Sequence, residues 1–246
     1  MTPRISVVVP AYNEGAAINK ALDNILQAIA TPCEVLVVYD TPEDTTAPFV
    51  ANYAAKDPRV VPTLNTSGRG PAKAISFGML HASTDVVVVT MADLSDDPRQ
   101  IDELAALVWG GAAIASASRY SRGGSKVGGP RFKGLLSRMA GVSLSRLAKV
   151  GTRDATNSFK AYSTNFLRSV RIESTAGFEL GIELVAKAHR LRLDIREIPT
   201  VWRDRTEGAS NFKLTKWLPK YLRWYLFAFG KRLTPAQLSS GSRVPS

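Results

Sequence analysis

The sequence of 246 residues contains a single cysteine, Cys33, and two histidines. One thiol forms no internal disulfide and builds no cysteine-based structural zinc site, which fits a reducing compartment. A run of about 18 apolar residues, the length that a helix needs to cross a bilayer, is also missing. The sequence therefore excludes a disulfide-stapled fold and predicts that any contact with a membrane is peripheral.

Acidic residues are scarce in the second half of the chain. The whole sequence has 32 Lys and Arg against 21 Asp and Glu, a net charge of +11. Residues 1–118 carry 7 basic and 13 acidic side chains, a net charge of −6, whereas residues 119–246 carry 25 and 8, a net charge of +17. A protein that coats DNA would not have an acidic half, so the function has to account for both halves.

The first half alternates short β-branched runs with helical segments. The runs lie at 5–9, 34–39, 60–64, 85–90 and 112–116. Apolar spacing predicts a helix that carries Ile18 to Ile29 and ends before Pro32, and further helices at about 45–56, 71–82 and 98–109. Such β-α-β repeats predict an α/β fold with a mostly parallel sheet flanked by helices. Ligands then bind beyond the carboxyl ends of the strands.

The second half is less regular. Residues 121–130 predict a mobile, basic loop, followed by a helix at 131–149, a strand at 158–162, a helix at 177–190 and a strand at 193–198. No linker is evident, so we expect one continuous domain over 1–210, with halves at 1–118 and 119–210 that differ in charge. An amphipathic helix is expected over 211–232 and a disordered tail over 233–246.

Polar clusters follow the first two predicted strands. Residues 10–14 suit a pocket for a flat ring and its hydrogen-bonding edge, although a turn in which Asn13 caps the next helix explains them as well. Asp40 stands where a carboxylate can hold a base or a ribose, and an Asx turn is equally consistent. Residues 68–70 open a helix and form either an anion site or a tight loop before Pro71.

A carboxylate, Asp93, follows the strand predicted at 85–90, whose four central valines are apolar on both faces. Mg²⁺ and Mn²⁺ prefer few carboxylates together with phosphate oxygens, so Asp93 is well placed to bind such an ion against a diphosphate. The ion would act as a Lewis acid toward the departing nucleotide diphosphate. Asp96 and Asp97, which precede Pro98, are instead typical of a helix start.

Several short stretches, spread in order over about residues 4–212, match one family. They lie at 7–14, 37–45, 92–95 with Pro98, 118–120, 154–162, 177–178 with Glu183, 197–199, and Arg205 with Gly208 and Ser210. Together they resemble the family-2 glycosyltransferases with a GT-A fold, in particular the polyprenyl-phosphate (dolichyl-phosphate) mannose and glucose synthases.

The resemblance implies that 1–210 is a catalytic domain, with a nucleotide-binding half at 1–118 and an acceptor half at 119–210. It also implies a role for each matching position. The nucleoside would be held by Pro10, Tyr12, Glu14 and Asp40. Ala92 and Asp93 would face the diphosphate and a Mg²⁺ or Mn²⁺ ion, with Arg205 and Arg203 near the donor diphosphate. The acceptor phosphate would contact Arg119, Lys133 and Ser137. The catalytic set would be Asp93, Arg119 and Arg205.

Three positions depart from the family pattern. The metal motif usually has two carboxylates, and here Met91 replaces the first. Three alternatives follow: Asp93 suffices alone, the metal binds more weakly, or Asp96 contributes. The acidic pair after the second strand is reduced to Asp40. The lysine that often follows the Gly-x-Ser element is Asn211. These changes leave the sugar and the nucleotide base of the donor open.

The expected reaction is an inverting transfer from a nucleotide-sugar to polyprenyl phosphate. Arg119 and Lys133 would orient the acceptor phosphate, which is ionised near neutral pH and needs no strong base. Catalysis then rests on positioning and electrostatic stabilisation.

The segment at 212–232 combines basic residues at helical spacing with aromatic and aliphatic residues, among them Leu218, Leu222 and Phe229. This pattern favours a helix in the bilayer interface, and packing against the protein's own sheet is the alternative. We expect a cytoplasmic protein at the inner face of a membrane, to which the resemblance adds a small membrane-protein subunit as a partner. A glycan or other soluble acceptor, a non-catalytic member and a nucleic-acid-binding protein are the competing readings.

Overall fold

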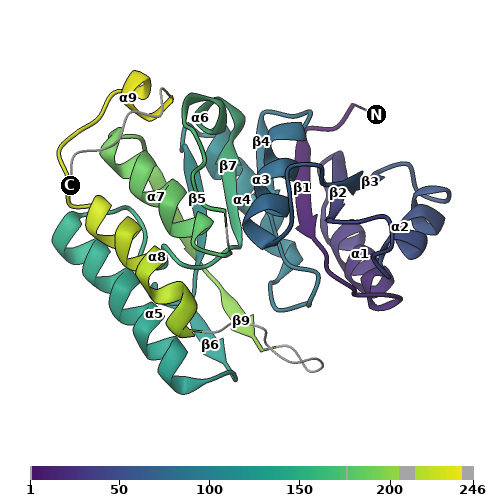
Figure 1. The fold of residues 1–246 in the computed structure, drawn as a ribbon, viewed down its shortest axis with the longest axis horizontal. Coiled ribbons are helices and arrows are strands. Elements are labelled where there is room, and N and C mark those ends of the chain that lie inside the picture. The colour runs from purple at the N-terminus through teal and green to yellow at the C-terminus, as the bar shows by residue number, and fades with distance from the viewer. Residues whose placement is uncertain (1, 176, 205–213, 240–246) are drawn as a thin grey trace.

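The centre of the molecule is a seven-stranded sheet (Figure 1). The computed structural model describes residues 2–175, 177–204 and 214–239. In spatial order the strands are β3 (Val60–Leu64), β2 (Cys33–Tyr39), β1 (Ile5–Pro10), β4 (Val86–Val89), β7 (Lys160–Ser163), β5 (Ile114–Ser118) and β8 (Ile195–Pro199). Only β7 runs antiparallel to its neighbours, β4 and β5. The predicted α/β fold with a mostly parallel sheet is confirmed.

Helices cover both faces of this sheet. They are α1 (Ala17–Ala28), α2 (Ala47–Ala54), α3 (Pro71–His81), α4 (Ile101–Trp109), α5 (Arg131–Ser143), α6 (Thr164–Ser169), α7 (Leu180–Arg190), α8 (Leu214–Phe227) and α9 (Pro235–Ser239). In β4, Val86 and Val88 pack in a core with α1 and α4, and Val87 and Val89 pack in a second core with α3 and α7. The apolar run of β4 is therefore that of a strand buried on both faces.

Two expectations for the second half need correction, and one predicted helix is confirmed with a change of type in its last turn. Within the predicted loop at 121–130, β6 (Ser125–Val127) pairs with β9 (Val201–Arg203) in a small parallel sheet. The helix expected at 131–149 is α5 followed by a π-helical turn at Leu144–Ala148. The prediction of a disordered tail is wrong for α9, because Leu238 is buried and its carbonyl accepts a hydrogen bond from Arg171.

Helix α8 has apolar residues on two faces rather than on one. Trp224 and Ala228 are buried in the core beside α7. Leu218, Leu222 and Leu226 follow each other at helical spacing and are 50%, 50% and 61% exposed. One face of the segment therefore packs on the protein and the other is open, and the helix in the bilayer interface stays a prediction.

Buried cationic side chains of α7 contact aromatic rings of α8. The ammonium of Lys187 is fully buried, forms an ion pair of 2.6 Å with Glu183 and lies 4.9 Å from the ring centroid of Trp224. The guanidinium of Arg190 lies 4.3 Å from the ring centroid of Phe227. Such cation–π contacts are strongest where water is excluded, so they define how α8 sits on the domain.

Helix α3 approaches the sheet very closely at Gly78. A Cβ atom at this position would lie 2.6 Å from Cγ1 of Val8 in β1 and 2.9 Å from Cγ2 of Val38 in β2. Val8 and Val38 are fully buried. A side chain at residue 78 would therefore force α3 away from the centre of the sheet.

We predict that Gly78→Ala destabilises the protein. Overpacking a core costs about 1–3 kcal/mol, which exceeds the ~1 kcal/mol that a helical Gly→Ala change gains in propensity. Urea unfolding of the variant checks this, with Ser76→Ala in the same helix as the control. A Gly78→Ala protein as stable as the wild type would show that α3 relaxes freely.

Candidate functional site

The loops after β1 and β2 are tied together by a buried carboxylate. Both oxygens of Asp44 accept the backbone N–H of Asn13 at 3.1 Å. In return, Oδ1 of Asn13 accepts the N–H of Thr45, and the Thr46 hydroxyl accepts the N–H of Glu14. Asn13 has a φ of 54°, which asparagine tolerates better than most residues. The predicted nucleoside segment is therefore held in a fixed shape.

Asp40 fixes the loop between β3 and α3 in a similar way, by accepting hydrogen bonds from it. Its Oδ1 accepts from the Asn65 side chain and its Oδ2 from the N–H of Gly70, both at 2.7 Å. Gly70 has a φ of 109° at the start of α3, a conformation that glycine adopts without strain. Of the other predicted nucleoside residues, Pro10 ends β1 and Tyr12 is 67% exposed.

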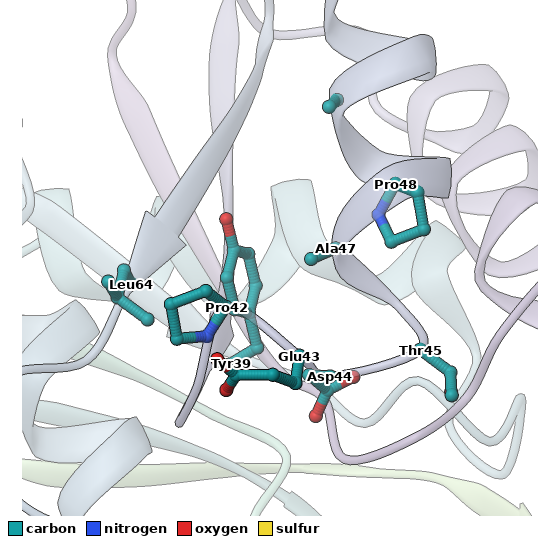
Figure 2. A pocket seen from close by; sticks show the side chains of 9 residues that line it. Tyr39, Pro42, Glu43, Asp44, Thr45, Ala47, Pro48 and Leu64 are labelled. Atoms are coloured by element: carbon teal, nitrogen blue, oxygen red, sulfur yellow. The ribbon is translucent and has the colours of Figure 1, made fainter.

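A cavity of about 580 Å³ adjoins this part of the site. Figure 2 shows the Tyr39 ring between Pro42 and Leu64 on one side and Ala47 on the other. The residues that line it come from the end of β2, the loop that follows, the start of α2 and the end of β3. The predicted contacts Pro10, Tyr12, Glu14 and Asp40 are not among them.

The loop after β4 brings two carboxylates together. The chain turns at Leu94, which has a φ of 61°, and the N–H of Ser95 donates to Asp93. Asp96 accepts hydrogen bonds from the Thr90 hydroxyl and the N–H of Met91. Burial and then the nearby Asp93 raise the pKa of Asp96 to about 7.

These two carboxylates are the ligands that this loop offers to a cation. Among the described residues, no group of three or more His, Cys, Asp and Glu side chains could hold a metal ion. A divalent ion would therefore complete its shell with oxygens from elsewhere. That donor set fits Mg²⁺ or Mn²⁺, which are commonly bound by one or two carboxylates plus phosphate oxygens.

Arg119, which follows β5, forms a buried ion pair with Asp154. Its Nε and Nη2 donate to the two oxygens of Asp154 at 2.7 and 2.8 Å. Asp154 is fully buried, and the Arg119 side chain is 11% exposed. Burial alone would lower the pKa of Arg119, but Asp154 more than offsets this, so the pKa is raised and the guanidinium stays charged.

A hydroxyl network extends from this pair to α5. Nη2 of Arg119 also donates to the hydroxyls of Ser137 and Thr156, which lie 2.6 Å apart. The Tyr120 hydroxyl lies 3.0 Å from that of Ser137. Nearby, burial lowers the pKa of Lys160 to about 7, and the ammonium contacts backbone carbonyls of the segment that contains Asp154.

A second cavity, of about 500 Å³, opens beside this network. Its lining includes three basic residues, Arg119, Lys126 and Arg138, and no acidic residue. Helix α5 begins at its edge without a capping side chain. The basic lining and the helix start both favour the binding of an anion in this cavity.

Most of the predicted site residues can be placed. Ala92 is buried beside Asp93, and Arg203 is exposed, with its N–H bonded to the carbonyl of Ser95 at 3.1 Å. Arg119 and Ser137 share the network described above. Arg205 and the side chain of Lys133 lie outside the described part of the chain.

Sequence reasoning gave no role to Lys126, Arg138, Asp154 or Lys160. Asp154 and Lys160 lie in a stretch that matched the family, which is the signal that could have found them. Lys126 and Arg138 carried no signal beyond their charge.

Comparison with known proteins identifies the family. The model of glycosyl transferase family 2 matches residues 6–171. The chain belongs to this family. It is 30% identical over 226 residues to the dolichol-phosphate mannosyltransferase of Pyrococcus furiosus, covering 89% of this chain and 62% of the relative's length. It is 27% identical to the polyprenol monophosphomannose synthase of Mycolicibacterium smegmatis, covering 88% and 87%.

Solved structures support the fold. The glucosyl-3-phosphoglycerate synthase of Mycobacterium tuberculosis, solved with Mn²⁺, UDP and glucosyl-3-phosphoglycerate, has a TM-score of 0.65 at 20% identity. The match covers 94% of this chain and 82% of the other. The predictions of a family-2 glycosyltransferase and of a Rossmann-like GT-A fold are therefore confirmed.

We predict that Asp154→Asn strongly destabilises this glycosyltransferase. Removing one partner of a buried pair leaves an uncompensated charge, here Arg119, at a cost of about 3–5 kcal/mol. Urea unfolding measures the loss. The control is Arg153→Gln, which breaks the adjacent, half-exposed pair with Glu197 and should cost at most about 1 kcal/mol. Equal stabilities of the two variants would contradict the assigned importance of Asp154.

Proposed function

We propose that this chain transfers a sugar, with inversion, from a GDP- or UDP-linked donor to polyprenyl phosphate. One observation carries the proposal: the cation-lined cavity at Arg119 is also lined by Leu135, on a helix whose exposed residues include large apolar side chains. An acceptor with a phosphate head and an apolar tail matches both features. The names of the mannosyltransferase relatives support the same acceptor.

The proposed sugar transfer requires the protein mainly to position the donor and the acceptor. An oxygen of the acceptor phosphate attacks the anomeric carbon, the bond from that carbon to the donor diphosphate breaks, and the nucleoside diphosphate leaves with both bonding electrons. The acceptor phosphate is already ionised, so no strong base is required. Arg119, Lys133 and Ser137 organise the acceptor end, and fixed dipoles and charges stabilise the transition state.

The donor is assigned to the loops after β1, β2 and β4. Pro10, Tyr12, Glu14 and Asp40 belong to the braced segments that would hold the nucleoside. Asp93, with Asp96 beside it, would hold a Mg²⁺ or Mn²⁺ ion. When bound, that ion neutralises negative charge on the departing diphosphate. Arg203, linked to the same loop through Ser95, and Arg205 would bind the diphosphate.

The same proposal includes peripheral binding to the inner face of the membrane. Helices α5 and α8 touch through the hydroxyls of Ser143 and Tyr225, 3.0 Å apart, and run side by side (Figure 1). Large exposed apolar side chains lie on both: Phe132, Leu135 and Met139 on α5, and Leu218, Leu222 and Leu226 on α8. No helix in the described ranges has the length and apolar character to span a bilayer.

We predict that the protein converts radiolabelled nucleotide-sugar and polyprenyl phosphate into an organic-extractable, mild-acid-labile product. A panel of GDP- and UDP-sugars with Mg²⁺ and Mn²⁺ identifies the donor and the ion. A chelator should abolish turnover. Label that stays in the aqueous phase with a phosphorylated or glycan acceptor would instead identify a soluble acceptor.

Within the same assay, Asp93→Ala should reduce turnover about 100-fold or more, because the charge on the leaving group is no longer neutralised. The control is Asp97→Asn, whose carboxylate forms an ion pair with the exposed Arg99. Full activity of Asp93→Ala would overturn the metal assignment.

We predict that Leu218, Leu222 and Leu226 together hold the protein on vesicles that contain anionic lipid. Replacing all three with serine should abolish cosedimentation, because each buried leucine contributes about 1.5–3 kcal/mol when removed from water. The control is the triple replacement by valine, which keeps the face apolar. A requirement for a membrane-protein subunit would appear as no binding of the wild type to protein-free vesicles.

A further inference from the structure

Three of the five guanidinium N–H donors of Arg119, those on Nε and Nη2, are directed at the protein itself. Two of its nitrogens bind the carboxylate of Asp154, and its Nη2 also reaches Ser137 and Thr156. The positive charge of the guanidinium is thus balanced by the carboxylate of Asp154, and the side chain is mostly buried. An acceptor phosphate that met only Arg119 would compete with a carboxylate in an ideal fork-like geometry.

The hydroxyl of Ser137 is equally engaged. It lies within hydrogen-bond distance of Nη2 of Arg119, the hydroxyl of Tyr120 and the hydroxyl of Thr156. One hydroxyl has one proton to donate and two lone pairs. Ser137 therefore serves as the centre of the network more than as a donor to a ligand.

Arg138, the next residue on α5, is differently placed. It lines the same cavity, it is exposed, and within the described parts of the chain no hydrogen bond or ion pair involves it. The positive charge of Arg138 acts on the site: burial raises the pKa of Tyr120, and the charge of Arg138 lowers it. Lys126 on β6 and the start of α5 lie on the same cavity wall.

We propose that Arg138 contacts the phosphate monoester of the acceptor in the cavity that it shares with Arg119, whose position is fixed by Asp154. This inference rests on the proposed function for its acceptor and deepens it by naming the residue that recognises the phosphate. Arginine suits the task, since its planar fork binds two phosphate oxygens at once. Leu135, on the same wall, then lies where an apolar tail leaves the cavity.

The test compares Arg138→Gln and Arg138→Lys with the wild type in steady-state kinetics. The acceptor is polyprenyl phosphate in detergent micelles. For Arg138→Gln we expect the acceptor KM to rise about 10-fold or more, as the loss of a charged hydrogen bond predicts, with the donor KM unchanged. Arg138→Lys should recover part of the loss, because it keeps the charge without the fork.

Arg146→Gln is the matched control, since this arginine is also exposed, on the π-helical continuation of α5, and outside the cavity lining. It should leave both KM values unchanged. Calorimetric titration with geranyl phosphate repeats the comparison without turnover, and thermal unfolding checks that each variant is folded. An Arg138→Gln protein with wild-type acceptor KM and geranyl phosphate affinity overturns the proposal, as does an equal effect of Arg146→Gln.

Failure of the proposed function gives a different result. If the wild type rejects polyprenyl phosphate but glycosylates a soluble phosphate monoester such as 3-phosphoglycerate, the lipid acceptor is wrong. The Arg138 comparison is then decided on that soluble acceptor. If the wild type transfers sugar only to acceptors without phosphate, both proposals fall.

Discussion

The ion pair between Arg119 and Asp154 is the interaction on which the acceptor half of the site depends. It joins the end of β5 to the segment before β7, and through Ser137 it reaches α5. A buried pair of this kind adds little net stability over an apolar pair, so its value lies in fixing one arrangement of the surrounding groups. The hydroxyls around it are ordered because the guanidinium at their centre is held in one place by Asp154.

The reversed strand β7 explains why Asp154 is found at this edge of the sheet. In the parallel strands, loops at the carboxyl ends face the ligand. Because β7 runs the other way between β4 and β5, the residues that precede it arrive at the same edge. Lys160, the first residue of β7, enters the site for the same reason.

Much of the fold could be predicted from the sequence, because β-branched runs and helical spacing fix the elements of the first half. The strand predicted at 60–64 is β3, with the same bounds, and Cys33 is a buried core residue as expected. Asp93 could be proposed as a metal ligand because it follows a buried strand. Asp154, Lys160 and Arg138 could not be assigned roles in this way, since an antiparallel strand and the turn of a helix bring them to the site from other positions. Burial of a lysine such as Lys160 has no local sequence signal.

The attachment of α8 has a practical consequence for anyone who shortens the chain. Its exposed leucines make it a natural segment to remove in search of a better-behaved protein. Deletion would, however, strip Trp224 and Phe227 from the cations of Lys187 and Arg190 and leave the core around α7 open to water. A truncated protein would lose the small apolar surface of the α8 leucines and expose a larger apolar surface around α7. It is therefore better to keep the helix and replace its exposed leucines.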